Sequence, residues 1–196
     1  MKLILATTNR GKIEEFASYL ENTGIPLSSL ADLSERPDIV ENGETFMDNA
    51  LIKARAVCAF TGLPSLADDS GLEVDALDGR PGVMSARFGP TPEARNLRLL
   101  EKMKDVGDER RTARFVCALA LVRPDGFVWT TAGVCEGRIT RAPAGERGFG
   151  YDPVFFYEAL GRTFAEIPRE AKNRISHRGI ALEAFRKAVE SNGILG

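Results

Sequence analysis

The hydrophobic pattern along the chain predicts strands and helices that alternate at both ends of the protein. Residues 2–6 (KLILA) are nearly all apolar and are bounded by polar residues, which is typical of a short buried strand. Apolar residues then recur at helical spacing over 11–21, where Asn9 is available as the N-cap and a glycine and a proline follow the helix. The same spacing over 178–191 predicts a final amphipathic helix.

Two further helices and a hairpin are predicted in the middle of the chain. Thr45 begins a Thr-x-x-Asp capping box, which predicts a helix over 45–60, and a proline at the favoured first position predicts another over 91–104. Residues 112–123 and 127–138 flank a Pro-Asp-Gly turn and predict a hairpin. Because both alternating sets of positions in the first hairpin strand are apolar, we expect it to be covered on both faces.

The acidic segment in front of the third helix is interpreted as two strand pieces, 65–69 and 72–77, around a tight Ser-Gly turn at 70–71. Such a turn would place Asp69 at a strand end, where α/β folds bind their ligands. Residues 79–90 are rich in glycine and proline and predict a loop. Together the elements predict an α/β fold with a mixed sheet.

Composition narrows the class of protein. The chain has 196 residues, which suggests one large domain or two lobes that share a sheet. Twenty-six basic and 28 acidic side chains leave a net charge of -2, which argues against a general binder of nucleic acid or acidic membranes. Three scattered cysteines and one histidine argue against a disulfide framework and against a zinc site. Since no apolar run has the length of a signal peptide or a membrane span, we expect a soluble, cytoplasmic protein.

The segment TTNRGK (7–12) follows the first strand and opens a helix, where backbone N–H groups and a partial positive charge attract anions. Lys12 adds a full charge, so the segment is suited to a triphosphate. It lacks the spacing of a Walker A loop. Taken alone, it favours the simpler interpretation that Asn9 caps the helix and Lys12 is solvated, because polar caps outnumber phosphate sites.

Three carboxylates are candidates for metal binding. Glu41, Asp68 and Asp69 supply oxygen ligands of the kind that magnesium prefers. Neighbouring residues of a strand point to opposite faces, so only one aspartate can face a given site. The sequence Asp-Asp-Ser-Gly is also good turn chemistry, and the two interpretations are about equally supported, with a slight preference for a rigidly mounted carboxylate.

Two later segments are candidates for ligand binding. In GFGYDP (148–153), Phe149 or Tyr151 can stack on a purine and Asp152 can accept hydrogen bonds from it, although a turn with core aromatics is favoured for the segment alone. The segment KNRISHR (172–178) contains four potential cations near the start of the last helix, and such runs are usually solvated. A Ser-His-Asp hydrolase is excluded because the chain has no G-x-S-x-G elbow.

Five segments gain weight when they are taken together: TTNRGK (7–12), ENGETFMDNALIKAR (41–55), LADDSGLEVDALDGRPGVMSARF (66–88), GFGYDPVFF (148–156) and ISHRGIAL (175–182). In this order and spacing they closely resemble the inosine triphosphate pyrophosphatase family, whose members are also called dITP/XTP or non-standard purine nucleoside triphosphate pyrophosphatases. The likeness runs from Lys2 to about Phe185. Each segment is modestly specific, and the five together are highly specific.

The resemblance implies a fold and an activity. The expected fold is an ITPase-like or Maf-like α/β fold: one domain over residues 1–196, with a long mixed β-sheet, flanking helices and two lobes around a deep cleft. The implied reaction converts dITP, ITP, XTP or dXTP to the monophosphate and pyrophosphate with one Mg²⁺ per subunit, which keeps deaminated purines out of DNA and RNA. The implied partners are the purine nucleoside triphosphate and a second copy of the chain, with no nucleic acid and no membrane.

The resemblance also implies site residues by position. Asp69 matches the proton acceptor and, together with Glu41, the metal ligands. The triphosphate is expected at 7–12. The full set of implied substrate contacts is Thr7, Thr8, Asn9, Arg10, Gly11, Lys12, Lys53, Ser70, Phe149, Gly150, Tyr151, Asp152, Lys172, His177 and Arg178.

In the implied reaction, water attacks the α-phosphorus and pyrophosphate leaves, so the protein mainly positions groups and neutralises charge. Asp69 would orient a water that magnesium acidifies, and Lys12 with neighbouring backbone N–H groups would offset charge on the pyrophosphate. Donors from His177, Arg178 or amides near Phe149 would prefer a 6-oxo purine to adenine.

Several alternatives stay open at this stage. A house-cleaning pyrophosphatase of the Maf type would act on a pyrimidine or a modified nucleotide, and a nucleotide-binding module would use 7–12 without turnover. A nucleic-acid-binding protein would need a basic stripe that the sequence lacks. The loop 79–89, with apolar Met84 and Phe88, is expected in the dimer surface, although it can equally fold back onto its own lobe.

Overall fold

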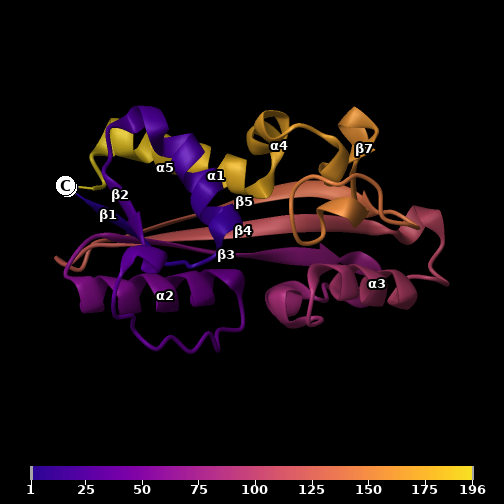
Figure 1. The fold of residues 1–196 in the computed structure, drawn as a ribbon, viewed down its shortest axis with the longest axis horizontal. Coiled ribbons are helices and arrows are strands. Elements are labelled where there is room, and N and C mark those ends of the chain that lie inside the picture. Colours follow the sequence, from indigo (N-terminus) through magenta and orange to yellow (C-terminus); the bar gives the residue numbers. More distant parts are fainter. Residues whose placement is uncertain (1, 196) are drawn as a thin grey trace. The chain divides into compact units, whose positions relative to one another are not determined.

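The computed structural model describes residues 2–195, and seven strands within this range form one sheet (Figure 1). The strand order is β2-β1-β3-β4-β5-β6-β7. The sheet is mixed, because β1 pairs in parallel with β2 and β3 while β6 pairs antiparallel with β5 and β7. The strands are β1 (Leu3–Leu5), β2 (Leu27–Ser29), β3 (Ser65–Val74), β4 (Thr112–Val122), β5 (Val128–Ile139), β6 (Phe155–Tyr157) and β7 (Arg162–Thr163).

The long α-helices begin within one residue of the predicted positions, and the predicted hairpin is present as β4 and β5. Asn9, Thr45 and Thr91 cap α1, α2 and α3, since each side chain accepts a hydrogen bond from the backbone N–H three residues later. The pattern does not predict α4 or the short strands β2, β6 and β7. Among residues 2–195 there is no helix with the length and apolarity that a bilayer crossing needs. The α-helices are α1 (Arg10–Leu20), α2 (Phe46–Thr61), α3 (Pro92–Lys102), α4 (Arg169–Ile175) and α5 (His177–Asn192).

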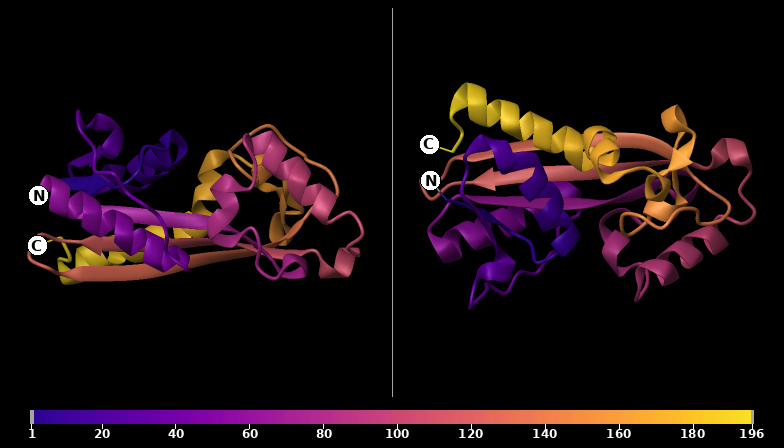
Figure 2. Two further views of the ribbon diagram at one scale, coloured as in Figure 1. Left: turned by 90° about the horizontal axis from the view of Figure 1, so that it is seen from below. Right: turned by 45° about the horizontal axis from the view of Figure 1, so that its top comes forward.

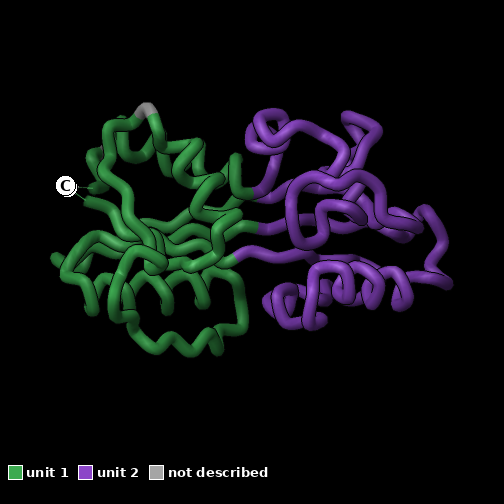
Figure 3. The backbone as a smooth tube through the Cα atoms, viewed as in Figure 1, with its two compact units in different colours: residues 1–69, 117–133, 178–196 green, residues 70–116, 134–177 purple. Residues whose placement is uncertain are grey.

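The chain folds into two compact units, which Figure 3 shows in green and purple. In the described chain, unit 1 contains residues 2–69, 117–133 and 178–195, and unit 2 contains residues 70–116 and 134–177. Three strands, β3, β4 and β5, each contribute residues to both units. Each unit has its own apolar core.

Unit 1 buries apolar residues on both faces of its strands. Phe16 of α1 and Phe185 of α5 belong to the same core cluster as Leu66 and Leu119, while α2 covers the opposite face of these strands (Figure 2). Every residue of β4 from 117 to 122 is buried. The prediction that this strand is covered on both faces is therefore confirmed for its second half.

Unit 2 has an aromatic core. Phe115 of β4 packs against Phe155 and Phe164, whose ring centroids lie 4.5 and 5.9 Å away. Residues 112–116 alternate between buried and more exposed positions. Arg114, on the exposed side, pairs with Glu73 and Glu136 of the neighbouring strands and with Asp75, which follows β3. The predicted cover on both faces is wrong for this half of β4, because its second face carries a charged network instead of apolar side chains.

The predicted turn at 70–71 is also wrong, because β3 continues without interruption from Ser65 to Val74. Leu66 lies in the core of unit 1, and Leu72 and Val74 lie in the core of unit 2. Burial at both ends holds the segment extended and overrides the turn preference of Ser-Gly. Asp69 consequently lies in the middle of a long strand and not at a strand end.

Candidate functional site

The segment between β1 and α1 forms a capped helix start. The Oδ1 atom of Asn9 accepts a hydrogen bond from the backbone N–H of Lys12 at 3.2 Å, and the backbone N–H of Asn9 donates to Oγ1 of Thr7 at 3.2 Å. Thr8, Asn9 and Arg10 are exposed. Since the first N–H groups of a helix have no partner within the helix, this exposed start can donate to an anion.

Lys12 is not a solvated surface lysine, so the simpler interpretation of 7–12 is wrong for this residue. Its side chain is 15% exposed, and its Nζ atom forms an ion pair with the Asp68 carboxylate. The same Nζ atom also donates to the backbone carbonyl of Asp68 at 3.5 Å. Asp68, which lies 56 positions later in the sequence, therefore fixes the position of the Lys12 charge at the start of α1.

Asp68 is the centre of a buried ionic network in unit 1. Its side chain is 1% exposed and accepts from Nε of Arg178 at 3.1 Å and from Sγ of Cys117 at 3.4 Å. Arg178 in turn forms an ion pair with Glu15 of α1. Burial opposes ionisation of Asp68, but the charges of Arg178 and Lys12 outweigh it and hold the pKa of Asp68 well below its usual range. Asp68 is therefore a fixed anion that positions Lys12 and Arg178.

Asp69, the next residue of β3, contacts a different helix. Its Oδ2 atom accepts from Nδ2 of Asn49 at 3.1 Å, and its Oδ1 atom lies 3.2 Å from Nζ of Lys53; both partners belong to α2. The predicted alternation is thus confirmed, since Asp68 contacts α1 and α5 whereas Asp69 contacts α2. Burial raises the pKa of Asp69, and the charges of Lys53 and Lys12 partly oppose this shift.

Glu41 reaches the same lysine from the segment that precedes α2. Its Oε2 atom lies 2.8 Å from Nζ of Lys53. The segment is held by Asn49, whose Oδ1 atom accepts from the backbone N–H of Gly43 at 2.8 Å. A Cβ atom at Gly43 would lie 2.6 Å from Cβ of Asp48, so this close approach to α2 requires glycine. The sequence interpretation missed Asn49, although its i, i+4 spacing from Lys53 places both side chains on one face of α2.

Glu41 and Asp69 have the chemistry of a magnesium site. Their carboxylates converge on a single cationic atom, Nζ of Lys53. Magnesium is commonly bound by one or two carboxylates together with substrate phosphates and water. Within residues 2–195 there is no group of three or more metal-ligating side chains. The donor set therefore fits an ion that is bound together with a phosphate group and does not fit a cage made by the protein alone.

In unit 2, the segment 148–152 exposes one aromatic ring and buries the other. Phe149 is 37% exposed, whereas Tyr151 is 5% exposed and lies in the core. The Tyr151 hydroxyl donates to the backbone carbonyl of Ser85 at 2.8 Å, and burial raises the pKa of Tyr151 to about 12. Of the two aromatic candidates for stacking on a purine, only Phe149 presents an exposed ring.

A buried ion pair supports this ring. The Oδ2 atom of Asp152 accepts from Nζ of Lys172 at 2.6 Å and from the backbone N–H of Phe149 at 2.8 Å. Nζ of Lys172 lies 4.6 Å from the centroid of the Phe149 ring. A Cβ atom at Gly148, whose φ is +74°, would lie 2.0 Å from Asp152, so the tight segment requires glycine there.

The cationic run at 172–178 is mostly buried, so its interpretation as a solvated face is wrong. Lys172 and His177 are each 5% exposed, Arg178 is 2% exposed, and only Arg174 of the four cations is exposed. The His177 ring stacks on Phe115 with centroids 4.7 Å apart. Of the remaining predicted contacts, Ser70 is half-buried in β3, directly after Asp69.

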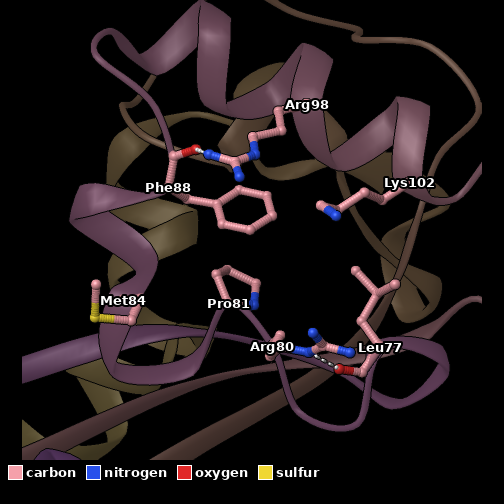
Figure 4. A pocket seen from close by; sticks show the side chains of 7 residues that line it. All are labelled: Leu77, Arg80, Pro81, Met84, Phe88, Arg98 and Lys102. Atoms are coloured by element: carbon pink, nitrogen blue, oxygen red, sulfur yellow. Dashed lines mark hydrogen bonds between the residues drawn. The ribbon is translucent and has the colours of Figure 1, made fainter.

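Unit 2 also contains a hollow of about 290 Å³ that involves none of the predicted site residues (Figure 4). The hollow adjoins the loop 79–89. In that loop, Met84 is 47% exposed, and the Phe88 ring lies 4.7 Å from the guanidinium carbon of Arg98. The residues that line the hollow are Leu77, Arg80, Pro81, Met84, Phe88, Arg98 and Lys102.

Comparison with known proteins places the chain among proteins of this architecture. The model of the Ham1 family matches residues 3–188. The chain belongs to the Ham1 family. It is 49% identical over 193 residues to a dITP/XTP pyrophosphatase of Desulforamulus reducens, covering 97% of this chain and 94% of the relative. It is 52% identical over 190 residues to a dITP/XTP pyrophosphatase of Thermus thermophilus, covering 96% and 91%.

Solved Ham1 structures have the same fold. A HAM1 protein from Coxiella burnetii matches with a TM-score of 0.89 at 40% identity, covering 97% of this chain and 98% of that one. The family membership, predicted from the five segments, and the α/β fold with a mixed sheet, predicted from the pattern of strands and helices, are therefore confirmed. The roles of the individual residues stay predictions.

Proposed function

We propose that this Ham1 protein hydrolyses non-standard purine nucleoside triphosphates, namely dITP, ITP, XTP and dXTP, to the monophosphate and pyrophosphate. The observation that carries the proposal is the convergence of Glu41 and Asp69 on one cationic atom, at 2.8 and 3.2 Å. A magnesium triphosphate needs such a carboxylate pair together with N–H donors, which the exposed start of α1 supplies. The names of the two relatives suggest the substrate class.

The two units contribute different parts of the binding chemistry. In unit 1, the segment 7–12, Lys53 and Arg178 supply N–H groups and positive charge for the phosphates. In unit 2, Phe149 supplies an exposed ring for stacking on the purine, and Lys172 is anchored beside it. Ser70, Gly150, Tyr151, Asp152 and His177 complete the proposed substrate contacts, with Tyr151 and Asp152 acting from buried positions.

Glu41 and Asp69 would hold one magnesium ion per subunit, which, when bound, supplies positive charge and acidifies a water molecule. Asp69 orients the water that attacks the α-phosphorus and accepts its proton. Lys12, fixed by Asp68, and the first N–H groups of α1 offset charge on the leaving pyrophosphate.

Selectivity for 6-oxo purines requires hydrogen-bond donors that adenine cannot satisfy. The backbone N–H of Phe149 already donates to Asp152, so it is not one of these donors. The remaining candidates in unit 2 are other backbone N–H groups near Phe149 and the His177 side chain, to which the structure adds Lys172, anchored beside the Phe149 ring. Arg178, the other donor expected from the sequence, lies in unit 1 between Asp68 and Glu15 and is assigned to the phosphates. Adenine, with a donor at the 6-position, cannot accept these hydrogen bonds.

The test is a substrate panel of dITP, XTP, dGTP and ATP with the phosphate products resolved. We expect dITP and XTP to be cleaved to monophosphate and pyrophosphate only with magnesium, and much faster than dGTP and ATP. Equal rates on all four would contradict the proposed selectivity. UTP is added to the panel as a pyrimidine triphosphate, and a preference for it would favour a Maf-type activity. Binding without release of pyrophosphate would favour a nucleotide-binding module.

Assembly and location also belong to the proposal. We propose a homodimer whose contact includes the loop 79–89, because Met84 is exposed there. Light scattering should give twice the subunit mass of 21.4 kDa, and Met84→Asp should shift the protein towards a monomer. A wild-type monomer would contradict this. A cytoplasmic location stays a prediction, supported by three buried cysteines without disulfides.

A further inference from the structure

Asn96 is a buried polar residue that neither the sequence pattern nor the proposed chemistry uses. It lies on α3 and is 5% exposed. Its Nδ2 atom donates a hydrogen bond to the backbone carbonyl of Gly150 at 3.1 Å, across 54 positions of sequence. Its Oδ1 atom is buried without a hydrogen-bond partner in the described part of the chain. Since buried polar atoms are normally satisfied, such an arrangement calls for a specific reason.

The segment that Asn96 contacts needs external anchors. Gly148 and Gly150 both have left-handed backbone conformations, with φ of +74° and +65°. Glycine gives a segment more conformational freedom than any other residue, so a chain with two of them does not hold one geometry by itself. The Phe149 ring, which we assign to stacking on the base, lies between these glycines.

Three contacts hold the segment, and each comes from a different element. Lys172 of α4 pairs with Asp152, the carbonyl of Ser85 accepts from the Tyr151 hydroxyl, and Asn96 of α3 donates to Gly150. Lys172 acts on the Asp152 side chain and also lies against the Phe149 ring, and the Ser85 contact acts on Tyr151. Asn96 acts on the backbone instead: it holds the peptide between Gly150 and Tyr151, whereas the Phe149 carbonyl accepts from the backbone N–H of Asp152 at 3.2 Å. The Asn96 contact therefore restrains the backbone conformation of Gly150, the glycine that follows Phe149.

The orientation of the Asn96 amide follows from its partner. A carbonyl oxygen can only accept hydrogen bonds. The NH₂ group of Asn96 must therefore face Gly150, and its Oδ1 atom must face away. An aspartate of the same shape would place a carboxylate against the Gly150 carbonyl, and a leucine would leave that carbonyl without its donor. If Asn96 fixes the segment, substitutions of similar shape but different hydrogen bonding, such as aspartate and leucine, should therefore impair it.

We propose that Asn96 is a positioning residue for purine recognition: it fixes the Gly150 peptide and thereby the Phe149 ring, without contact to the base. This inference rests on the proposed function, since it assigns the base to Phe149. It places one determinant of base selectivity on α3, which carries none of the substrate contacts implied by the family resemblance.

The test compares Asn96→Leu and Asn96→Asp with wild type, using two probes that separate base from phosphate. IMP reports binding of the base, and inorganic tripolyphosphate reports binding of the phosphates; both are titrated by calorimetry. We expect IMP affinity to fall about tenfold in both variants, the scale of a lost buried hydrogen bond. Tripolyphosphate affinity and kcat on dITP should stay within about twofold, so that the loss appears in KM.

Two controls exclude general damage. Asn96→His should restore most of the IMP affinity, because its Nδ1–H lies the same number of bonds from the backbone as the Asn96 Nδ2 atom. Leu97→Ala, at the neighbouring exposed position of α3, should leave both affinities unchanged. If leucine prevents folding, Asn96→Ala provides the same comparison.

The outcomes decide between the inference and its alternatives. Unchanged IMP affinity in Asn96→Leu would overturn the positioning role, and so would a parallel loss of tripolyphosphate binding, which indicates structural damage. Failure of wild type to bind IMP would overturn it as well. Wild-type binding of IMP without cleavage of dITP or XTP would refute the proposed function alone, while the variants would still test Asn96.

Discussion

The two units of this Ham1 protein use buried charge in different ways. Unit 1 contains a network of ion pairs in which Asp68 joins Lys12 and Arg178, and a second group in which Lys53 joins Glu41 and Asp69. In the candidate segment of unit 2 the buried charge is one pair, Lys172 with Asp152, placed against an aromatic ring. The difference supports the proposal that unit 1 binds the phosphates and unit 2 the base.

The largest effect that the comparison predicts concerns Asp69. We expect Asp69→Asn to lower kcat on dITP by about 10³-fold or more, because it removes the proton acceptor and one of the two metal-binding carboxylates. Binding of IMP, measured by calorimetry, should stay close to wild type, since the base is assigned to unit 2. Near-normal turnover of this variant would remove Asp69 from the mechanism.

Asp68, its neighbour on the strand, should instead affect stability. Asp68→Asn leaves Arg178 and Lys12 without a buried counter-charge, so the free energy of unfolding should fall by about 3–5 kcal/mol. Urea denaturation followed by circular dichroism measures this change. Glu136→Gln, which weakens an ion pair at an exposed side chain, is the control and should cost about 1 kcal/mol or less. Equal losses in the two variants would contradict the central role of Asp68.

A substitution of Lys172 tests the role proposed for unit 2, which is to bind the base. Lys172→Met leaves the Asp152 carboxylate without its buried partner and removes a proposed donor to the base. We expect KM for dITP to rise by about 10- to 100-fold, on the scale of a lost charged hydrogen bond. Inhibition by inorganic tripolyphosphate should not change. If both dITP binding and inhibition by tripolyphosphate weakened, the proposed division of the ligand, with the phosphates on unit 1 and the base on unit 2, would be wrong.

The smallest effect concerns local unfolding within each unit, which exposes a buried thiol to a reagent. Cys117 lies in unit 1 on a strand covered on both faces, whereas Cys135 lies in unit 2, and both thiols are buried. Burial raises the pKa of both thiols. In Cys58→Ala, which leaves one thiol per unit, we expect a thiol reagent to modify Cys135 before Cys117, because the more deeply covered strand opens less often. Mass spectrometry of the modified peptides measures the order, and the reverse order would contradict this view of the cores.

Local signals in the sequence predicted β1, α1, α2 and α5 of unit 1, but not β2, and they predicted the caps of three helices. The strand at 2–6, the Asn9 cap and the capping box at Thr45 depend on residues that are near one another in the chain, so they can be predicted without the fold. Membership of the family depended on the order of five segments, which no single segment establishes.

The burial of the charged residues could not be predicted in the same way. Arg178 contacts Asp68 across 110 positions of sequence, so a run of cations looks solvated until its partners are known. The turn predicted at 70–71 failed for a related reason, because the cores of two units hold β3 straight. Asn49 and Asn96 were missed because an asparagine carries no charge pattern and gains its role only from what it contacts.

The central claim is that unit 1 binds the phosphates and unit 2 binds the base. The most direct measurement is a crystal structure with inosine triphosphate and calcium, which replaces magnesium to slow turnover. The account predicts phosphate oxygens on the N–H groups at the start of α1, the metal ion on Glu41 and Asp69, and the hypoxanthine ring against Phe149. Phosphorus atoms far from residues 7–12 and from Asp69, or a base that does not touch Phe149, would contradict it.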